Sequence, residues 1–81
     1  MSVKGILDKL KWHPDYDFDK VTVKYVDRPK GFSEIRGYEI EKVSFKFIEL
    51  KSGTMIPTHR VVEIRYGDKI VWRKKHAEEQ V

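Results

Sequence analysis

The chain has 81 residues, with 17 Lys and Arg against 13 Asp and Glu, a net charge of +4 and no cysteine. This length fits one small domain and leaves little room for a deep catalytic cleft or a separate cofactor domain. The lack of cysteine excludes a disulfide scaffold, a thiolate zinc site and a cysteine nucleophile.

The first predicted element is a helix that begins after Ser2. Its apolar residues recur at the i, i+3, i+4 and i+7 positions of one helical face, namely Val3, Ile6, Leu7 and Leu10. Ser2 can cap the first turn with its hydroxyl. Pro14 disfavours helical geometry at His13, so the helix is expected to end near Trp12. Because a helix of about ten residues is marginal in water, we expect it to pack against the rest of the chain.

The acidic segment that follows, His13–Asp19, carries three aspartates at alternate positions. A calcium loop would also need a glycine at its sixth position and a glutamate at its twelfth. Those positions hold Lys20 and Val26. We therefore expect an acidic turn, anchored to the core by its two aromatic residues, and no calcium site.

The rest of the chain predicts strands and turns. Alternating β-branched and aromatic residues indicate strands at 21–25, 43–47, 54–57, 62–66 and 69–73. The apolar set changes face at Ile48, which predicts a bulge or a strand covered on both sides. Short hairpin turns are predicted at 51–53 and 67–68. The segment 27–37 shows no clear period and is expected to be an ordered loop.

These elements predict a single α+β domain over residues 1–81. In this fold the N-terminal helix packs on a curved, mostly antiparallel sheet of about five short strands, which curls into a half-open barrel. The ordered core is expected to span residues 2–74, and residues 75–81 are expected to form a flexible tail.

Basic and aromatic residues alternate along several predicted strands. The basic residues are Lys24, Lys46, Arg65 and Arg73, and the aromatic ones are Tyr25, Phe45, Phe47, Tyr66 and Trp72. Exposed aromatic rings could stack on bases while the cations met phosphates. Because the aromatic residues fall on the apolar faces, we expect most of them in the core.

The sharpest candidate site is the corner Pro57–Arg60, between two predicted strands. Proline ends strand pairing and fixes the backbone, so the three residues after it should project from a rigid turn. A hydroxyl, an imidazole and a guanidinium side by side can receive a phosphate. The alternative is structural: Arg60 pairs with a carboxylate such as that of Glu63, and His59 is a packing residue.

Catalytic and metal-binding signatures are missing from the sequence. The three histidines, His13, His59 and His76, lack metal-ligand spacing. None of them belongs to the paired His-x-Thr or His-x-Ser motif of two-histidine phosphoesterases. There is also no glycine-rich phosphate loop and no Gly-x-Ser-x-Gly motif. We therefore expect no cofactor, no metal and no catalytic residues.

Four short motifs resemble one known family: Trp12–Pro14, Gly53–Val61, Ile64–Tyr66 and Val71–Arg73. The family is a group of uncharacterised archaeal proteins, also called the RNA cyclic-group end recognition domain, and the resemblance covers about residues 3–74. It implies recognition of RNA ends that carry a cyclic phosphate. In multidomain relatives this domain accompanies RNA-end enzymes.

The resemblance and the corner together predict a non-catalytic RNA-binding module that recognises a phosphate at an RNA end. The residues expected to bind the end are His59 and Arg60 from the matched motif, Thr58 beside them, and Arg28, Arg65 and Trp12. One alternative is a phosphoesterase that opens the cyclic phosphate with His59 as acid or base. Another is an adaptor whose exposed strand edge pairs with a second protein.

The expected partners are an RNA end and an RNA-processing enzyme. No apolar run approaches the roughly 18 residues of a membrane span, and no secretory signal is recognisable, so we expect a cytoplasmic protein without membrane contact. The absence of asparagine, the single glutamine and the many charged residues are typical of a heat-loving source. The sequence leaves the oligomeric state open.

Overall fold

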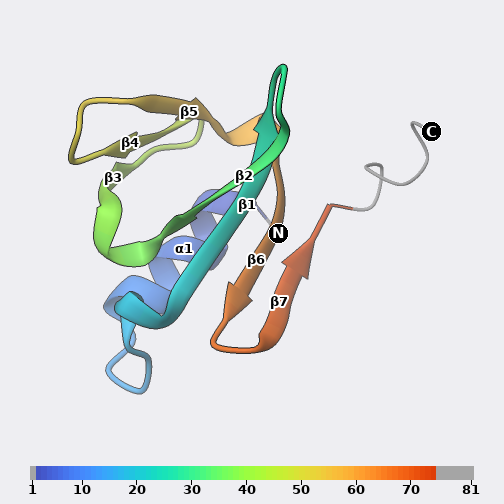
Figure 1. The fold of residues 1–81 in the computed structure, drawn as a ribbon. Coiled ribbons are helices and arrows are strands. Elements are labelled where there is room, and N and C mark those ends of the chain that lie inside the picture. The colour runs from blue at the N-terminus through green and yellow to red at the C-terminus, as the bar shows by residue number, and fades with distance from the viewer. Residues whose placement is uncertain (1, 75–81) are drawn as a thin grey trace.

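Residues 2–74, which the computed structural model describes, form one α-helix, seven β-strands and three short 3₁₀ helices. In chain order (Figure 1) they are α1 (Val3–Trp12), η1 (Phe18–Lys20), β1 (Val21–Asp27), β2 (Gly31–Arg36), η2 (Gly37–Glu39), β3 (Ile40–Val43), β4 (Phe47–Leu50), β5 (Met55–Pro57), η3 (Thr58–Arg60), β6 (Val61–Tyr66) and β7 (Lys69–Arg73). The predicted α+β class is confirmed. The predicted flexible tail, 75–81, lies outside the described residues.

Helix α1 forms as the sequence predicts. The hydroxyl oxygen of Ser2 accepts a hydrogen bond from the backbone N–H of Gly5 at 3.0 Å, and the helix ends at Trp12. Its buried residues are the predicted apolar stripe, Val3, Ile6, Leu7 and Leu10. This burial stabilises a helix that is too short to persist alone. Across residues 2–74, no helix has the length and apolar character needed to cross a membrane.

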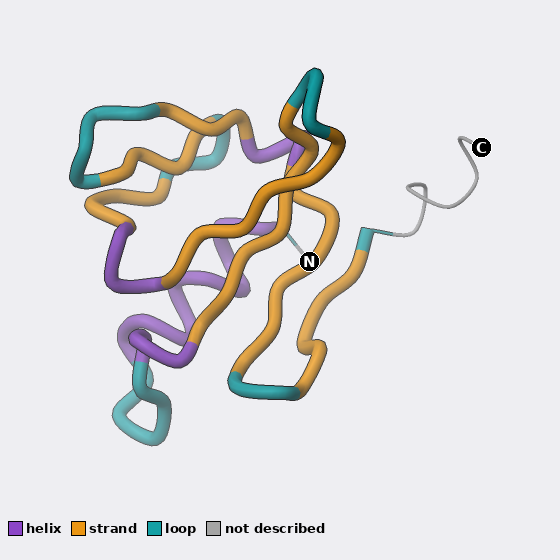
Figure 2. The backbone as a smooth tube through the Cα atoms, viewed as in Figure 1, coloured by secondary structure: helices purple, strands orange, loops and turns teal. Residues whose placement is uncertain are grey.

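The strands form two antiparallel sheets. Sheet A has four strands in the order β2-β1-β6-β7, and sheet B has three in the order β3-β4-β5. The predicted antiparallel pairing is confirmed, but the strands differ from the prediction in number and arrangement: the seven strands of residues 2–74 pair within two separate sheets and not in one half-open barrel of about five. Helix α1 lies behind β1 and β2 in Figure 1, and Figure 2 shows sheet B to one side of them.

The core is formed by helix α1 and the inward-facing side chains of both sheets. It is entirely aliphatic and comprises Val3, Ile6, Leu7, Leu10, Val21, Val23, Ile35, Ile40, Ile48, Leu50, Ile56, Val61 and Ile64. Partly buried aromatic side chains pack against it, among them Tyr25, Tyr66 and Trp72. These three residues border the core, so the expectation that strand aromatics lie in the core is met only in part.

The segment 27–37, expected to be a loop, contains strand β2. Gly31 begins this strand with a φ of +104°, in the left-handed region that favours glycine. β2 pairs with β1 over six residue pairs, from Asp27↔Gly31 to Thr22↔Arg36. Of the β2 residues, only Ile35 is buried. The strand therefore lacks the alternation of buried and exposed apolar residues by which strands are recognised.

The strand expected at 43–47 is in fact a turn between two strands. β3 ends at Val43 and β4 begins at Phe47. Ser44 closes the turn, because its backbone N–H donates to the Phe47 carbonyl at 2.8 Å and its hydroxyl accepts from the Phe47 N–H at 3.1 Å. The change of apolar face at Ile48 therefore marks a chain reversal and not a bulge. The two hairpin turns predicted from the sequence, 51–53 and 67–68, are confirmed.

The acidic segment before β1 is tied to the domain by hydrogen bonds. The Asp17 carboxylate accepts from the Asp19 N–H at 3.0 Å and caps η1, and the Asp17 N–H donates to the Tyr66 hydroxyl at 2.7 Å. Within the described part of the chain, no three His, Asp or Glu side chains are grouped as metal ligands. Asp17 therefore has a structural role in this turn.

Candidate functional site

The corner that joins sheet B to sheet A is the 3₁₀ helix η3. Pro57 is the last residue of β5, Thr58, His59 and Arg60 form η3, and Val61 begins β6. The Thr58 N–H donates to the Lys46 carbonyl at 2.8 Å, and its hydroxyl donates to the Phe45 carbonyl at 2.7 Å. Both bonds fasten η3 to the turn between β3 and β4. The Thr58 hydroxyl was predicted to help bind phosphate, but its hydrogen-bond donor is already used within the protein.

His59 and Arg60 both project into solvent from this corner. Within residues 2–74, Arg60 has no ion-pair partner. The carboxylate considered for it, that of Glu63, instead lies 3.3 Å from Arg65 and 3.6 Å from Arg73. The structural alternative raised from the sequence, an Arg60–Glu63 pair beside a buried His59, is therefore wrong.

Arg28 lies beside this pair, in the connection between β1 and β2. Strands β1 and β6 are antiparallel neighbours, with Tyr25 opposite Val61. The end of β1 therefore lies next to the start of β6, where η3 is attached. Val26, Arg28, His59 and Arg60 line one concavity of about 350 Å³. We call this concavity the arginine pocket.

The chemistry of the arginine pocket favours an anion. It is lined by two guanidinium groups, one imidazole and one aliphatic side chain, and by no carboxylate. Within the described range, Arg28 also lacks an ion-pair partner. A guanidinium carries donors in a planar fork that matches two phosphate oxygens, so unpaired arginines are well suited to bind a phosphate group.

A second concavity, of about 360 Å³, shares His59 with the arginine pocket. It is lined by Phe45, Lys46, Phe47, Pro57, Thr58 and His59, and we call it the phenylalanine hollow. The Phe45 side chain is 74% exposed and that of Phe47 is 39% exposed. The prediction that strand aromatics lie in the core is wrong for these two residues, because Phe45 lies in the turn and Phe47 directly follows it.

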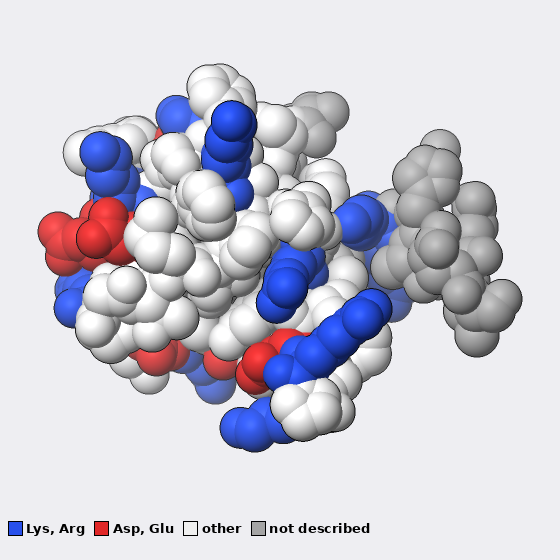
Figure 3. Space-filling model, turned by 90° about the horizontal axis from the view of Figure 1, so that it is seen from above, with Lys and Arg blue, Asp and Glu red and all other residues white. Residues whose placement is uncertain are grey.

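Cations border the phenylalanine hollow. Lys46 lines it, and the Lys4 ammonium of α1 lies 5.2 Å from the centre of the Phe45 ring. Figure 3 looks down on the molecule from the top of Figure 1. On this face, Lys and Arg side chains are scattered over a largely uncharged surface, with acidic side chains at its left and lower edges. The hollow therefore combines positive charge with exposed aromatic rings.

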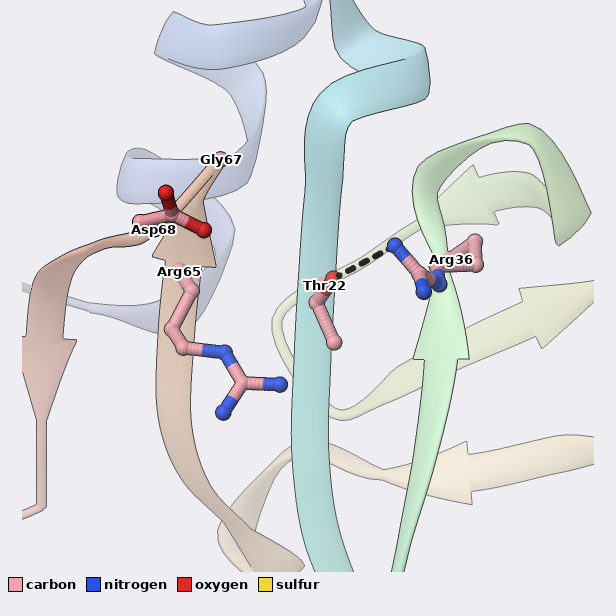
Figure 4. A pocket seen from close by; sticks show the side chains of 5 residues that line it. All are labelled: Thr22, Arg36, Arg65, Gly67 and Asp68. Atoms are coloured by element: carbon pink, nitrogen blue, oxygen red, sulfur yellow. Dashed lines mark hydrogen bonds between the residues drawn. The ribbon is translucent and has the colours of Figure 1, made fainter.

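Arg65, another predicted site residue, lies at a different place on sheet A. It lines a concavity of about 290 Å³ together with Thr22, Arg36, Gly67 and Asp68 (Figure 4). Its guanidinium lies 2.7 Å from the Glu34 carboxylate and 3.3 Å from that of Glu63. These carboxylates already neutralise Arg65, and Asp68 adds a further negative charge. This concavity is a weaker anion site than the arginine pocket.

Trp12 lines neither the arginine pocket nor the phenylalanine hollow. It is the last residue of α1, its side chain is 75% exposed, and the Lys11 ammonium lies 5.5 Å from its ring. Of the six residues predicted to bind the RNA end, the structure thus brings together Arg28, His59 and Arg60. Sequence reasoning missed Phe45 and Phe47 as surface residues.

Comparison with known proteins gives the same family as the sequence motifs. A UPF0248 protein of Archaeoglobus fulgidus is 54% identical over 68 residues, which cover 84% of this chain and 99% of that protein. A UPF0248 protein of Metallosphaera sedula is 38% identical over 74 residues, covering 91% and 94% of the two chains. The UPF0248 protein MJ1316 of Methanocaldococcus jannaschii is 36% identical, covering 90% and 94%. No solved structure matches.

These relatives are archaeal and are matched over nearly their whole length. The model of the family described as the MJ1316 RNA cyclic group end recognition domain matches residues 1–74, which includes every element of the fold and both concavities at η3. The chain therefore belongs to the MJ1316 RNA cyclic group end recognition domain family.

Proposed function

We propose that this protein is an RNA-binding module that recognises an RNA end bearing a phosphate, in particular a 2′,3′-cyclic phosphate. The observation that carries the proposal is the arginine pocket, in which two arginines without ion-pair partners in residues 2–74 flank an exposed imidazole. The description of the family, RNA cyclic group end recognition, supports the same ligand.

The pocket and the ligand are complementary in charge and in hydrogen bonding. A cyclic phosphate carries one negative charge and two non-bridging oxygens. Arg28 and Arg60 can donate to these oxygens, and the His59 ring can add a third donor. Hydrogen bonds to charged groups contribute about 1.5–3 kcal/mol each, and the exposed position of these side chains favours the lower value. After the cost of association, we expect an affinity in the micromolar range or weaker.

Binding without catalysis fits the composition of the pocket. Opening a cyclic phosphate by general acid–base catalysis usually requires two positioned groups, one to accept a proton and one to donate one. Of the four residues that line the pocket, only His59 has a side chain of the kind that commonly serves as a general acid or base. The proposed role is therefore that of an adaptor that holds an RNA end.

The test compares three forms of one short RNA, ending in a 2′,3′-cyclic phosphate, a linear 3′-phosphate or a free hydroxyl. The informative variant is Arg60→Gln. The matched control is Arg36→Gln, which removes the same charge from an exposed arginine at the concavity that Arg65 lines. Binding is measured by fluorescence anisotropy, and circular dichroism checks that both variants remain folded.

We expect the wild type to prefer the cyclic-phosphate end over the hydroxyl end, and Arg60→Gln to lose about tenfold in that preference. Arg36→Gln should keep it. Equal affinity for all three ends, or an unchanged preference in folded Arg60→Gln, contradicts end recognition. Incubation of the cyclic-phosphate RNA with the protein tests catalysis separately, because turnover that is lost in His59→Ala would identify an enzyme.

A further inference from the structure

The exposure of Phe45 is not explained by the packing of the domain. Its ring is 74% exposed and lies outside the aliphatic core, whereas Tyr25, Tyr66 and Trp72 pack against that core. Phe47, two residues later, is also exposed. Leaving two large apolar rings in water forgoes the stabilisation that their burial would give. Neighbouring exposed aromatic residues at a concavity are typical of a binding surface.

The turn that carries Phe45 is held in place. Ser44 bonds to the backbone of Phe47 on one side, and Thr58 of η3 donates to the carbonyls of Phe45 and Lys46 on the other. Pro57 also lines the hollow. The phenylalanine hollow is therefore a preformed surface, so a ligand can bind without first ordering this turn.

The surroundings of the hollow specify the chemistry of its occupant. Lys46 and His59 line it, and the Lys4 ammonium, which is ion-paired with the Asp8 carboxylate, lies 5.2 Å from the Phe45 ring centre. An aromatic surface with cations around it suits a flat, apolar group that is attached to an anion. A nucleobase meets this description, because its faces stack on aromatic rings while its backbone phosphates meet the cations.

The hollow adjoins the arginine pocket, since His59 lines both. In a nucleotide that ends in a cyclic phosphate, the base and the phosphate are attached to the same ribose. We propose that the phenylalanine hollow binds the terminal base of the RNA, stacked on Phe45 and Phe47, while the terminal phosphate occupies the arginine pocket. This inference rests on the proposed function and extends it from an end phosphate to a whole terminal nucleotide.

Phe32 provides a matched control near the arginine pocket. It lies in β2 opposite Val26, which lines the pocket, and its ring is 57% exposed. The Lys24 ammonium lies 4.8 Å from the centre of this ring, much as Lys4 lies near Phe45. Phe32 and Phe45 are thus both exposed rings with a lysine nearby, one paired with Val26 of the arginine pocket and one in the phenylalanine hollow. Truncating each in turn shows on which ring the base stacks.

The experiment uses a short RNA that ends in a 2′,3′-cyclic phosphate, either with an intact terminal base or with an abasic terminal ribose. Its affinity is measured for the wild type, Phe45→Ala and Phe32→Ala, with folding checked by circular dichroism. Both side chains are exposed, so neither truncation opens a cavity in the core. A 2-aminopurine at the terminal position reports stacking through its fluorescence.

We expect Phe45→Ala to weaken binding of the intact RNA by about 5- to 150-fold, which is the range for loss of one base–aromatic stack. Phe32→Ala should bind as the wild type does. Removing the terminal base should lower the RNA affinity of the wild type by a similar factor. It should not lower the affinity of Phe45→Ala any further. Quenching of 2-aminopurine on binding should disappear in Phe45→Ala.

Three results overturn the inference: equal affinity of Phe45→Ala and wild type, loss confined to Phe32→Ala, or no binding of any RNA by the wild type. The abasic RNA separates this inference from the proposed function. If the protein prefers a cyclic phosphate over a hydroxyl on the abasic RNA while Phe45→Ala has no effect, end recognition holds and the base site fails. If Phe45→Ala lowers the RNA affinity but all three RNA ends bind equally well, the base site is supported and end recognition is contradicted.

Discussion

The role of Thr58 can be tested by replacing it with valine, which keeps the size and β-branching of the side chain and removes the hydroxyl. In the structure this hydroxyl donates to the Phe45 carbonyl at 2.7 Å. The backbone bond from the Thr58 N–H to the Lys46 carbonyl, at 2.8 Å, is unaffected by the substitution. Thr58→Val therefore removes one of two bonds that hold η3 to the turn between β3 and β4.

The expected cost follows from the surroundings of this bond. A hydrogen bond in a protein contributes about 0.5–1.5 kcal/mol to the free energy of unfolding. Thr58 is only partly buried and the bond lies near solvent, so water can replace the lost donor. We therefore expect a loss of about 0.5–1 kcal/mol. For a domain of this size that corresponds to a decrease of about 2–8 °C in the melting temperature.

The assay combines thermal unfolding with binding of the cyclic-phosphate RNA. Because the hydroxyl is engaged within the protein, Thr58→Val should lower the melting temperature and keep the preference for the cyclic-phosphate end. Thr54→Val, at an exposed threonine in the turn before β5, serves as control and should lower the melting temperature less. An unchanged melting temperature together with a tenfold or greater loss of RNA affinity would refute this reasoning, since Thr58 would then contact the ligand directly.

Two further predictions concern stability. Gly37→Ala should lower the free energy of unfolding, measured in urea, by about 2 kcal/mol or more. The added Cβ would lie 1.9 Å from the Phe18 carbonyl oxygen, so η1 would have to move. Unchanged stability would contradict the close packing of η1 and η2. The pKa of the Tyr25 hydroxyl is raised by burial and by the nearby Asp27 carboxylate. Unfolded tyrosine ionises first, near pH 10, so Tyr25 stabilises the fold below that pH and this contribution is lost as the pH rises further. Stability should therefore fall less steeply between pH 9 and 11 in Tyr25→Phe, and equal slopes would contradict the shift.

Elements defined by local signals could be predicted from the sequence. Helix α1 has a cap at Ser2, a continuous apolar stripe and a stop signal at Pro14, all within a few residues of the positions they determine. The β6–β7 hairpin is similar, because Gly67 adopts the positive φ of +60° that its two-residue turn requires. In both cases the sequence neighbours of a residue are also its structural neighbours.

Two segments differ from their predicted secondary structure, because hydrophobic alternation reports burial and not strand geometry. β2 is an edge strand with a single buried residue, Ile35, so its pairing with β1 leaves no apolar pattern. The run Val43–Phe47 alternates as a strand would, yet Ser44 closes a turn within it. The change of apolar face at Ile48 was the available signal, and a chain reversal would have explained it.

The grouping of the site residues depends on which strands pair, and this is the information that a single sequence lacks. Arg28 follows β1 and Arg60 precedes β6, so the two meet only because β1 and β6 are antiparallel neighbours with Tyr25 opposite Val61. The same register explains why Arg65 is excluded. It lies opposite Thr22, four residues from Val61 and thus about 13 Å along the strand from the corner. The pairing of β1 with β6 therefore places Arg28 and Arg60 together at the arginine pocket and places Arg65 toward the other end of the sheet.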